Sequence, residues 1–207
     1  MTPSILFYFV CASVALTVAP GPDNIFVVTQ GITRGRRPAI VTALGMCSGI
    51  SIHTTAAAFG ISAVFYSSVF AFNVVKYAGA AYLLYLAYKT LRERSAIKLP
   101  LADDRPDAAL FKRGFIMNVL NPKVAMFFLA FLPQFVTPNT NYIPLQMLLL
   151  GFLFMIQAVV IFCLIGYFSG SIGSLILARP KIAKYFNWLT AGIFASLGVR
   201  LALAERG

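Results

Sequence analysis

The sequence predicts an all-α integral membrane protein with six transmembrane helices, arranged as two inverted three-helix repeats with broken first and fourth helices. Three observations predict this class. Of the 207 residues, 59% are hydrophobic and only 11% are charged. The apolar residues form six runs long enough to cross about 30 Å of hydrocarbon. Two of these runs contain helix-breaking prolines. The chain is expected to form a single transmembrane domain (1–207), with repeat halves at about 1–100 and 105–207.

The first run, Ser4–Thr33, is interrupted by Ala19-Pro20-Gly21-Pro22-Asp23-Asn24. Proline removes a helical donor and clashes with the preceding turn, so this run should form two half-helices. Gly21 can be the N-cap and Pro22 the first residue of the second half, whose free N–H groups carry partial positive charge. Asp23 would then lie at membrane depth beside the break, which makes it a candidate site residue. The alternative is a simple proline kink in which Asp23 is paired and inert.

The runs without a predicted break are expected to form continuous spans: Pro38–Tyr66, Val69–Leu91, Ile143–Ile172 and Tyr185–Leu203. Two polar residues lie well inside them. His53 is either an interior histidine held by hydrogen bonds or a proton relay. Lys76 either faces the interior or extends its ammonium group towards the membrane interface. The sequence leaves both pairs of alternatives open.

The fourth run, Gly114–Val136, contains Asn118-Val-Leu-Asn121-Pro122-Lys123. Asn121 can cap a second half-helix, and Pro122 can occupy its first position. This break follows Pro20 by about half the chain. Three spans in each half is an odd number, so a duplicated half would insert upside down. Matched breaks in two inverted halves indicate the central site of a transporter.

The connections between the runs alternate in charge. Lysines and arginines gather in the first, third and fifth connections, whereas the second and fourth have none. Cytoplasmic loops of membrane proteins are enriched in these residues, so the three basic connections are predicted to be cytoplasmic and both termini to lie outside. The same clusters account for the net charge of +11 without a basic amphipathic face, which argues against nucleic-acid binding.

Enzymatic and cofactor chemistry have little support in the sequence. Asp23 is the only acidic residue in the six runs and the chain has one histidine, so no nucleophile–base set or metal-ligand cluster is apparent. Cys11, Cys47 and Cys163 lack metal-ligand spacing and are predicted to be core residues. The N-terminus lacks a cationic signal-peptide region, so the first run is expected to be a retained helix. We therefore expect no enzyme activity, metal or cofactor.

Several short motifs lie at the breaks and in the neighbouring spans. They are Pro20-Gly-Pro-Asp-Asn24, Gly31, Gly35-Arg-Arg37, Ala43-Leu-Gly45, Gly49, Lys76-Tyr-Ala-Gly79-Ala-Ala-Tyr82, Asn118, Asn121-Pro-Lys123, Phe127-Phe128 and Pro133-Gln-Phe135. In this order they resemble the lysine-exporter/homoserine–threonine-resistance (LysE/RhtB) family over nearly the whole chain. The resemblance implies export of amino acids or related metabolites across the bacterial inner membrane, often by homo-oligomers such as a homodimer.

We interpret the protein as a secondary-active amino-acid exporter. Its candidate substrate-binding residues lie at the two breaks: Gly21, Asp23, Asn24, Asn118, Asn121 and Lys123. The half-helix N-termini, helped by Lys123, would face the substrate carboxylate, and the asparagines would supply neutral hydrogen bonds. Asp23 would bind the substrate ammonium group or a coupling proton. No ATP-binding motif is present, so the expected drive is an ion gradient or the substrate gradient, and proton antiport fits a buried aspartate. The alternative is a passive channel or a structural membrane subunit.

Overall fold

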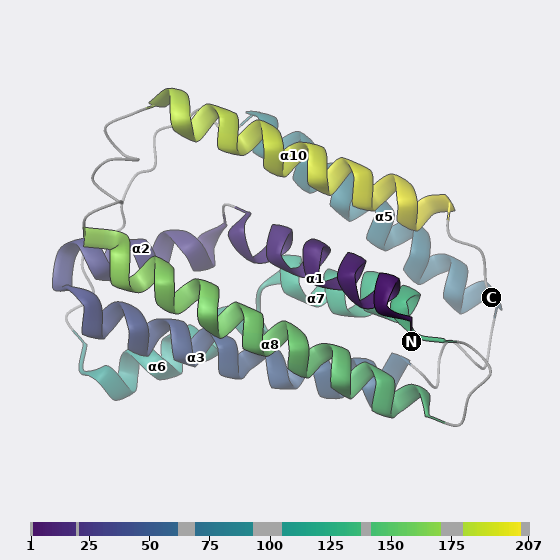
Figure 1. Cartoon of the computed structure of the whole chain (residues 1–207), viewed down its shortest axis with the longest axis horizontal. Helices are drawn as coiled ribbons and strands as arrows, with labels where there is room; N and C mark the ends of the chain where they lie inside the picture. Colours follow the sequence, from purple (N-terminus) through teal and green to yellow (C-terminus); the bar gives the residue numbers. More distant parts are fainter. Residues whose placement is uncertain are drawn as a thin grey trace.

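The computed structural model describes residues 2–19, 21–61, 69–92, 105–137, 142–170 and 180–203. Within these ranges every regular element is a helix. Figure 1 shows the helices running roughly along the long axis of the molecule. Helices satisfy their backbone hydrogen bonds internally, as hydrocarbon demands. The predicted all-α class is confirmed.

The first and fourth helices are both broken where proline follows a capping residue. α1 (Pro3–Val18) meets α2 (Pro22–Arg34) at a bend of 57°. The second break bends by 46° and joins α6 (Asp107–Val119) to α7 (Pro122–Met126), which η2 (Phe127–Phe131) and η3 (Leu132–Phe135) continue. The predicted division of these two runs into half-helices is therefore present in the structure.

The two breaks are built alike. Gly21 is the N-cap of α2 and Asn121 is the N-cap of α7, and a proline occupies the first position of each half-helix. The proline that corresponds to Pro122 is thus Pro22, which shifts the expected register by two residues. Pro20, on which the expected register was based, lies outside the described residues.

The unbroken helices are α3 (Arg36–Thr55) with its continuation η1 (Ala56–Ile61), α5 (Val69–Arg92), α8 (Ile143–Phe168) and α10 (Pro180–Leu203). Among the described residues, 2 helices are long and apolar enough to cross a membrane alone, Arg36–Gly60 and α8. Counting each bent pair as one span raises the number to 4. The six-span count therefore stays a prediction.

Two helices begin earlier than the apolar runs suggest. α6 starts at Asp107 rather than near Gly114, and α10 starts at Pro180 rather than at Tyr185. The extra turn of α6 contains Lys112 and Arg113, which end the apolar run but are good helix formers. Hydropathy therefore marks where a segment can enter hydrocarbon, whereas the helix extends further.

Glycines allow α3 to pack closely against helices on two sides. A Cβ atom on Gly45 would collide with the Phe111 carbonyl of α6, and one on Gly151 of α8 would collide with the Thr54 side chain of α3. α5 and α10 pack against each other along one side of the molecule (Figure 1). They reach the other helices through contacts of α10 with α1 and of α5 with η2.

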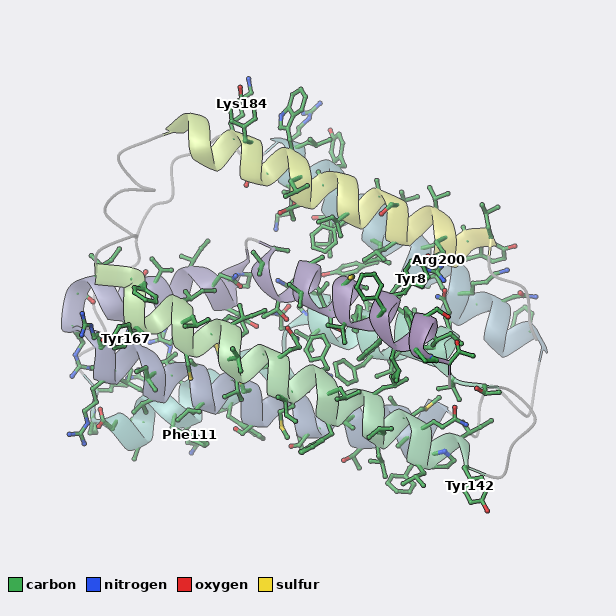
Figure 2. The ribbon with its side chains drawn as sticks, in the orientation of Figure 1. Tyr8, Phe111, Tyr142, Tyr167, Lys184 and Arg200 are labelled. Carbon is green, nitrogen blue, oxygen red and sulfur yellow. The ribbon has the colours of Figure 1, made fainter. Side chains whose placement is uncertain are left out.

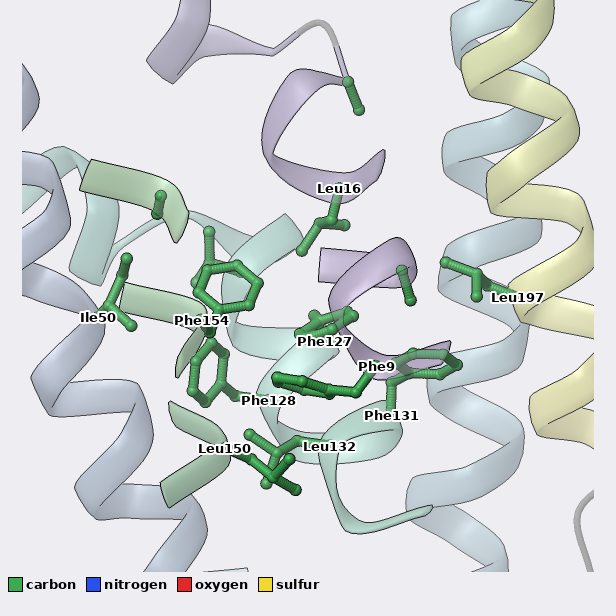
Figure 3. Packing of buried hydrophobic residues seen from close by; sticks show 14 of the residues in the cluster. Phe9, Leu16, Ile50, Phe127, Phe128, Phe131, Leu132, Leu150, Phe154 and Leu197 are labelled. Carbon is green, nitrogen blue, oxygen red and sulfur yellow. The ribbon is translucent and has the colours of Figure 1, made fainter. Parts of the chain in front are cut away.

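A cluster of phenylalanines holds the broken helices together beyond the breaks (Figure 3). The ring centroids of Phe9 in α1 and Phe135 in η3 lie 5.3 Å apart, and those of Phe127 in η2 and Phe154 in α8 are also 5.3 Å apart. Aromatic pairs at such distances stabilise a core beyond their buried area. This cluster holds α1 of the first broken helix against η2 and η3 of the second, so packing helps to set the geometry of the breaks.

The outer surface has the character of a lipid-facing bundle. α8 exposes an apolar residue at every third or fourth position: Leu145, Leu149, Phe152, Ile156, Val160 and Leu164. Figure 2 places the exposed tyrosines Tyr142 and Tyr167 at opposite ends of the molecule. Tyrosine is enriched at membrane–water interfaces, where its ring is buried and its hydroxyl is hydrated. This pattern fits α8 spanning the bilayer between the two tyrosines.

Candidate functional site

The C-terminal end of α1 is capped by side chains from beyond the break. A helix leaves its last four carbonyl groups without intrahelical partners, and in α1 these belong to Leu16, Thr17, Val18 and Ala19. The Lys123 ammonium group donates to the carbonyls of Leu16 and Ala19, both at 3.1 Å. All of this occurs away from bulk solvent, since Lys123 is only 6% exposed.

Asn24 caps the remaining two carbonyl groups. Its Nδ2 atom donates to Thr17 at 2.9 Å and to Val18 at 3.2 Å. Together, Asn24 and Lys123 satisfy all four terminal carbonyls of α1. A cation at a helix C-terminus also interacts favourably with the helix dipole. Asn24 and Lys123, two of the predicted substrate-binding residues, therefore use most of their hydrogen-bond donors to cap α1 at the first break.

Gly21 allows the lysine to reach into this break. A Cβ atom at Gly21 would lie 3.2 Å from Lys123 Nζ, closer than an ordinary van der Waals contact. Asn121 helps to aim the lysine, because its Oδ1 atom accepts a hydrogen bond of 2.9 Å from the Lys123 backbone N–H. The predicted N-cap role of Asn121 is thus confirmed.

Asp23 lies at the start of α2, next to the end of α6. Its carboxylate is 2% exposed and occupies the first turn of the helix, where the dipole favours an anion. Asp23 Oδ2 accepts a long hydrogen bond of 3.4 Å from Asn118 Nδ2. The structure therefore brings together the acidic residue of one break and an asparagine of the other.

Several oxygens around this contact have no hydrogen-bond partner within the described part of the chain: Asp23 Oδ1, Asn24 Oδ1 and Asn118 Oδ1. Buried polar atoms without partners are rare because each has lost its water. Asp23 and Lys123 are not joined by an ion pair among the described residues, since the lysine bonds the α1 carbonyls instead. The alternative in which Asp23 is neutralised by Lys123 has no direct contact to support it.

His53 of α3 forms a hydrogen bond to the second break. Its Nε2 atom lies 3.1 Å from the carbonyl oxygen of Asn118, and since a carbonyl only accepts, the ring nitrogen must donate. The ring also lies near Phe128, with centroids 5.9 Å apart. Of the two alternatives for this residue, the hydrogen-bonded interior histidine has a contact in the structure.

Other polar residues near α1 and α2 were not singled out from the sequence. Gln30 and Thr42 are fully buried and lack hydrogen-bond partners within the described ranges. One signal was available for Gln30: it follows Asp23 by seven residues, which places both on one face of a helix. Elsewhere, Lys76 is buried on α5 with its ammonium 4.5 Å from the Tyr77 ring centroid.

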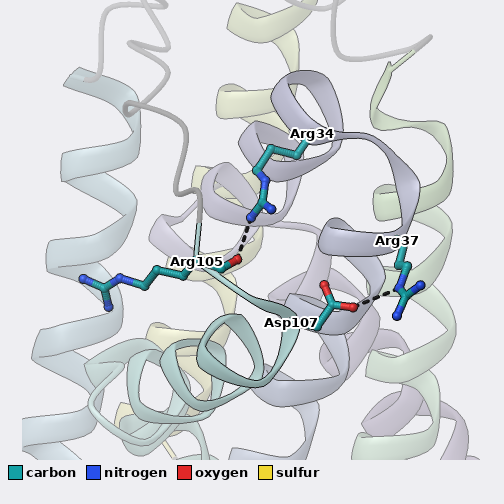
Figure 4. Close-up of polar contacts among 4 residues, drawn as sticks. All are labelled: Arg34, Arg37, Arg105 and Asp107. Atoms are coloured by element: carbon teal, nitrogen blue, oxygen red, sulfur yellow. Dashed lines mark hydrogen bonds and ion pairs between the residues drawn. The ribbon is translucent and has the colours of Figure 1, made fainter.

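The C-terminal end of α2 and the start of α3 both contact the chain at or just before the start of α6. Arg37 Nε lies 2.9 Å from Asp107 Oδ2, and Arg34 Nη1 donates to the Arg105 carbonyl at 2.9 Å (Figure 4). α2 therefore meets α6 at the break, and its other end bonds the chain just before α6, while α3 pairs with the first residue of α6.

Comparison with known proteins assigns the chain to a family. Residues 14–205 match the profile of the LysE type translocator family. A homoserine/homoserine lactone efflux protein of Salmonella typhimurium is 32% identical over 96% of both chains. An uncharacterized membrane protein of Vibrio cholerae is 30% identical, covering 95% of this chain and 96% of the relative.

In Bacillus subtilis, the uncharacterized membrane protein YrhP is 29% identical over 97% of this chain and 99% of its own. No solved structure matches the fold. The family match covers nearly the whole chain, and the relatives are membrane proteins of the same length. The chain therefore belongs to the LysE type translocators, a family of bacterial inner-membrane transporters rather than enzymes.

Proposed function

We propose that the protein is a secondary-active exporter of amino acids or closely related metabolites, with its substrate site at the two breaks. The efflux proteins among its relatives support the class of activity. The observation that carries the site is the buried carboxylate of Asp23, which faces Asn118 from the other half of the chain. An intramembrane carboxylate with an unpartnered oxygen is costly and is expected to have a function.

The proposed architecture is six spans in two inverted repeats. Its support is the likeness of the two breaks: N-cap, proline and then a charged residue, Asp23 in one and Lys123 in the other. The two breaks also bond each other, because Lys123 donates to the terminal carbonyls of α1, while Asn118 at the end of α6 donates to the Asp23 carboxylate. In an inverted-repeat transporter the substrate site lies between such discontinuous helices.

The unpartnered atoms favour a zwitterion as substrate. Oxygens of Asp23, Asn24 and Asn118 would accept from a primary ammonium group. The N-termini of α2 and α7 attract a carboxylate. There Asn121 offers an Nδ2 atom without a partner in the described residues. Lys123 has used two of its three N–H donors, so one is left for the carboxylate. Gly21 keeps the backbone accessible beside it.

Proton antiport is the proposed drive, with Asp23 as the proton carrier. It is the only acidic residue in the apolar runs, so no other carboxylate in them is available to alternate between a proton and the substrate ammonium. Moving one charge through 100 mV is worth about 2.3 kcal/mol, enough to concentrate a substrate about 50-fold. The homo-oligomer implied by the family resemblance is tested by the mass of the purified protein in detergent.

Efflux from proteoliposomes tests this function. L-Homoserine is the first probe, within a labelled mixture of amino acids, and a proton gradient is imposed across the membrane. We expect saturable efflux that the gradient accelerates. Efflux that neither saturates nor responds to the gradient would instead support a passive channel, and no flux of any probe would support a structural subunit.

The variant Asp23→Asn should abolish efflux at normal membrane abundance, because it removes the charge that binds ammonium or a proton while keeping the side-chain shape. Asp107→Asn is the matched control, since Asp107 is also acidic but lies at the polar start of α6. It should retain nearly full efflux. Full efflux by Asp23→Asn would remove Asp23 from the transport mechanism.

A further inference from the structure

Two fully buried polar side chains lie away from the breaks and make no hydrogen bond with the part of the chain that the structure describes. Gln30 on α2 and Thr42 on α3 are both 0% exposed. Neither amide atom of Gln30 nor the hydroxyl of Thr42 makes a hydrogen bond within the described part of the chain. Thr29, equally buried beside Gln30, does satisfy its hydroxyl, which donates to the Ile25 carbonyl at 2.8 Å. A polar side chain can therefore be fully buried in this part of α2 and still have a hydrogen-bond partner.

The position of Gln30 along α2 is well defined. Asp23, Gln30 and Arg34 are separated by seven and then four residues, so all three share one face of the helix. Asp23 meets α6 at Asn118, and Arg34 meets its start at the Arg105 carbonyl (Figure 4). Gln30 thus lies between these two contacts, about 10 Å from Asp23 along the helix.

Thr42, on α3, lies beside α6. A Cβ atom at Gly114 of α6 would lie 2.5 Å from the Thr42 carbonyl, so the two backbones are in close contact there. Gly114 precedes Asn118 by one helical turn and is therefore also between the break and the polar end of α6. The segments of α2 and α3 that carry Gln30 and Thr42 consequently both border α6 between its break and its polar end, and we call this region the seam.

We propose that Gln30 and Thr42 form a second polar site, which the substrate's ammonium or carboxylate group occupies on its way between the cytoplasmic end and Asp23. This proposal rests on the proposed transport function and deepens it. An amide and a hydroxyl can each donate and accept, so they can replace water around either group of a zwitterion. Neither is charged, so they bind the passing substrate without retaining it. In the conformation described, the seam is closed and the site is empty of protein partners.

Substitution separates this role from a structural one. An apolar residue of similar shape in place of an unpartnered buried amide removes a desolvation cost, so Gln30→Leu should raise the melting temperature. It should also raise the half-saturating cytoplasmic concentration of L-homoserine about 3- to 10-fold, the effect of one lost hydrogen bond. Thr42→Val should act in the same direction. A lower melting temperature with unchanged half-saturation would overturn the proposal.

Thr29→Val is the matched control for these variants. It removes a buried hydroxyl from the neighbouring position, but one already bonded within α2. We expect its half-saturating concentration to stay within about twofold of the parent protein, a difference smaller than one hydrogen bond. An effect as large as that of Gln30→Leu would show that any change in this part of α2 disturbs transport, and would count against the site.

Chemical accessibility gives a readout that does not depend on transport. In a background with Cys11, Cys47 and Cys163 replaced by alanine, Gln30→Cys should react with a membrane-impermeant thiosulfonate added from the cytoplasmic side. L-Homoserine should slow that reaction. Thr29→Cys should stay unreactive. Equal, slow labelling of both positions would disprove an accessible site at Gln30. Absence of any flux in the parent protein, with Gln30→Cys still labelled, would count only against the proposed function.

Discussion

Lys123 and Asn24 use their donors to close the end of a helix inside the membrane. The last four carbonyls of α1 would otherwise be unpaired at a depth where water is scarce. The sequence indicated that these residues lie at the breaks, because proline and capping rules act over a few neighbouring residues. It could not indicate which atoms they would bond, because that depends on how α1 and α7 pack against each other across more than 100 residues.

Lys123→Met should destabilise the protein strongly. Methionine keeps the length of the side chain but leaves the Leu16 and Ala19 carbonyls unpaired, at about 1–3 kcal/mol for each. The measurement is the free energy of unfolding of the purified protein. Lys123→Arg, which keeps the donors, should lose less. Because Lys123 and Asp23 share no ion pair, adding Asp23→Asn to Lys123→Met should not restore stability, and restoration would reveal a charge pair that the described contacts lack.

At the level of elements, local rules predicted helix starts better than helix packing. Proline at the first helical position and a cap before it specify the starts of α2 and α7 without any knowledge of the fold. The early start of α6 was missed, since polar residues in its first turns end the apolar run without ending the helix. Which glycine touches which helix is likewise not determined locally: Gly45 faces α6, whereas a Cβ atom at Gly192 of α10 would meet open space.

Alanine at these two glycines should therefore have opposite effects. Gly45→Ala forces its methyl group into the Phe111 carbonyl and should destabilise by about 1–3 kcal/mol through overpacking. Gly192→Ala meets open space within a helix and should stabilise by about 0.5–1 kcal/mol, because alanine loses less backbone entropy. Melting temperatures of the two purified variants test this difference. If Gly45→Ala were neutral, α3 and α6 would pack less closely than the structure describes.

At the scale of the whole molecule, the contacts between basic and acidic ends and the contact between the breaks both indicate that the two broken helices run in opposite directions. The basic residues where α2 ends and α3 begins lie beside the start of α6, where Arg37 of α3 pairs with Asp107. α2 runs from the first break towards the end of the molecule at which α6 begins, and α6 runs from that end back to the second break. The two broken helices therefore run in opposite directions along the molecule. Such opposite directions are what an inverted repeat requires, and composition alone cannot supply them.

Reporter fusions test this arrangement through the location of the connections. Six spans with cytoplasmic basic loops place a fusion near Asp104 in the cytoplasm, and place fusions in the connection at 137–142 and after Gly207 outside. The fusion at 137–142 tests the second broken helix separately, because this connection lies opposite Asp104 only if the bent pair Asp107–Val119 and Pro122–Phe135 crosses the membrane as one span. With Asp104 in the cytoplasm, a cytoplasmic C-terminus would mean an even number of spans in the second half instead of three. The two halves could then not be inverted copies of three spans each. The direction of α2 would then no longer place Gln30 and Thr42 on the cytoplasmic side of Asp23.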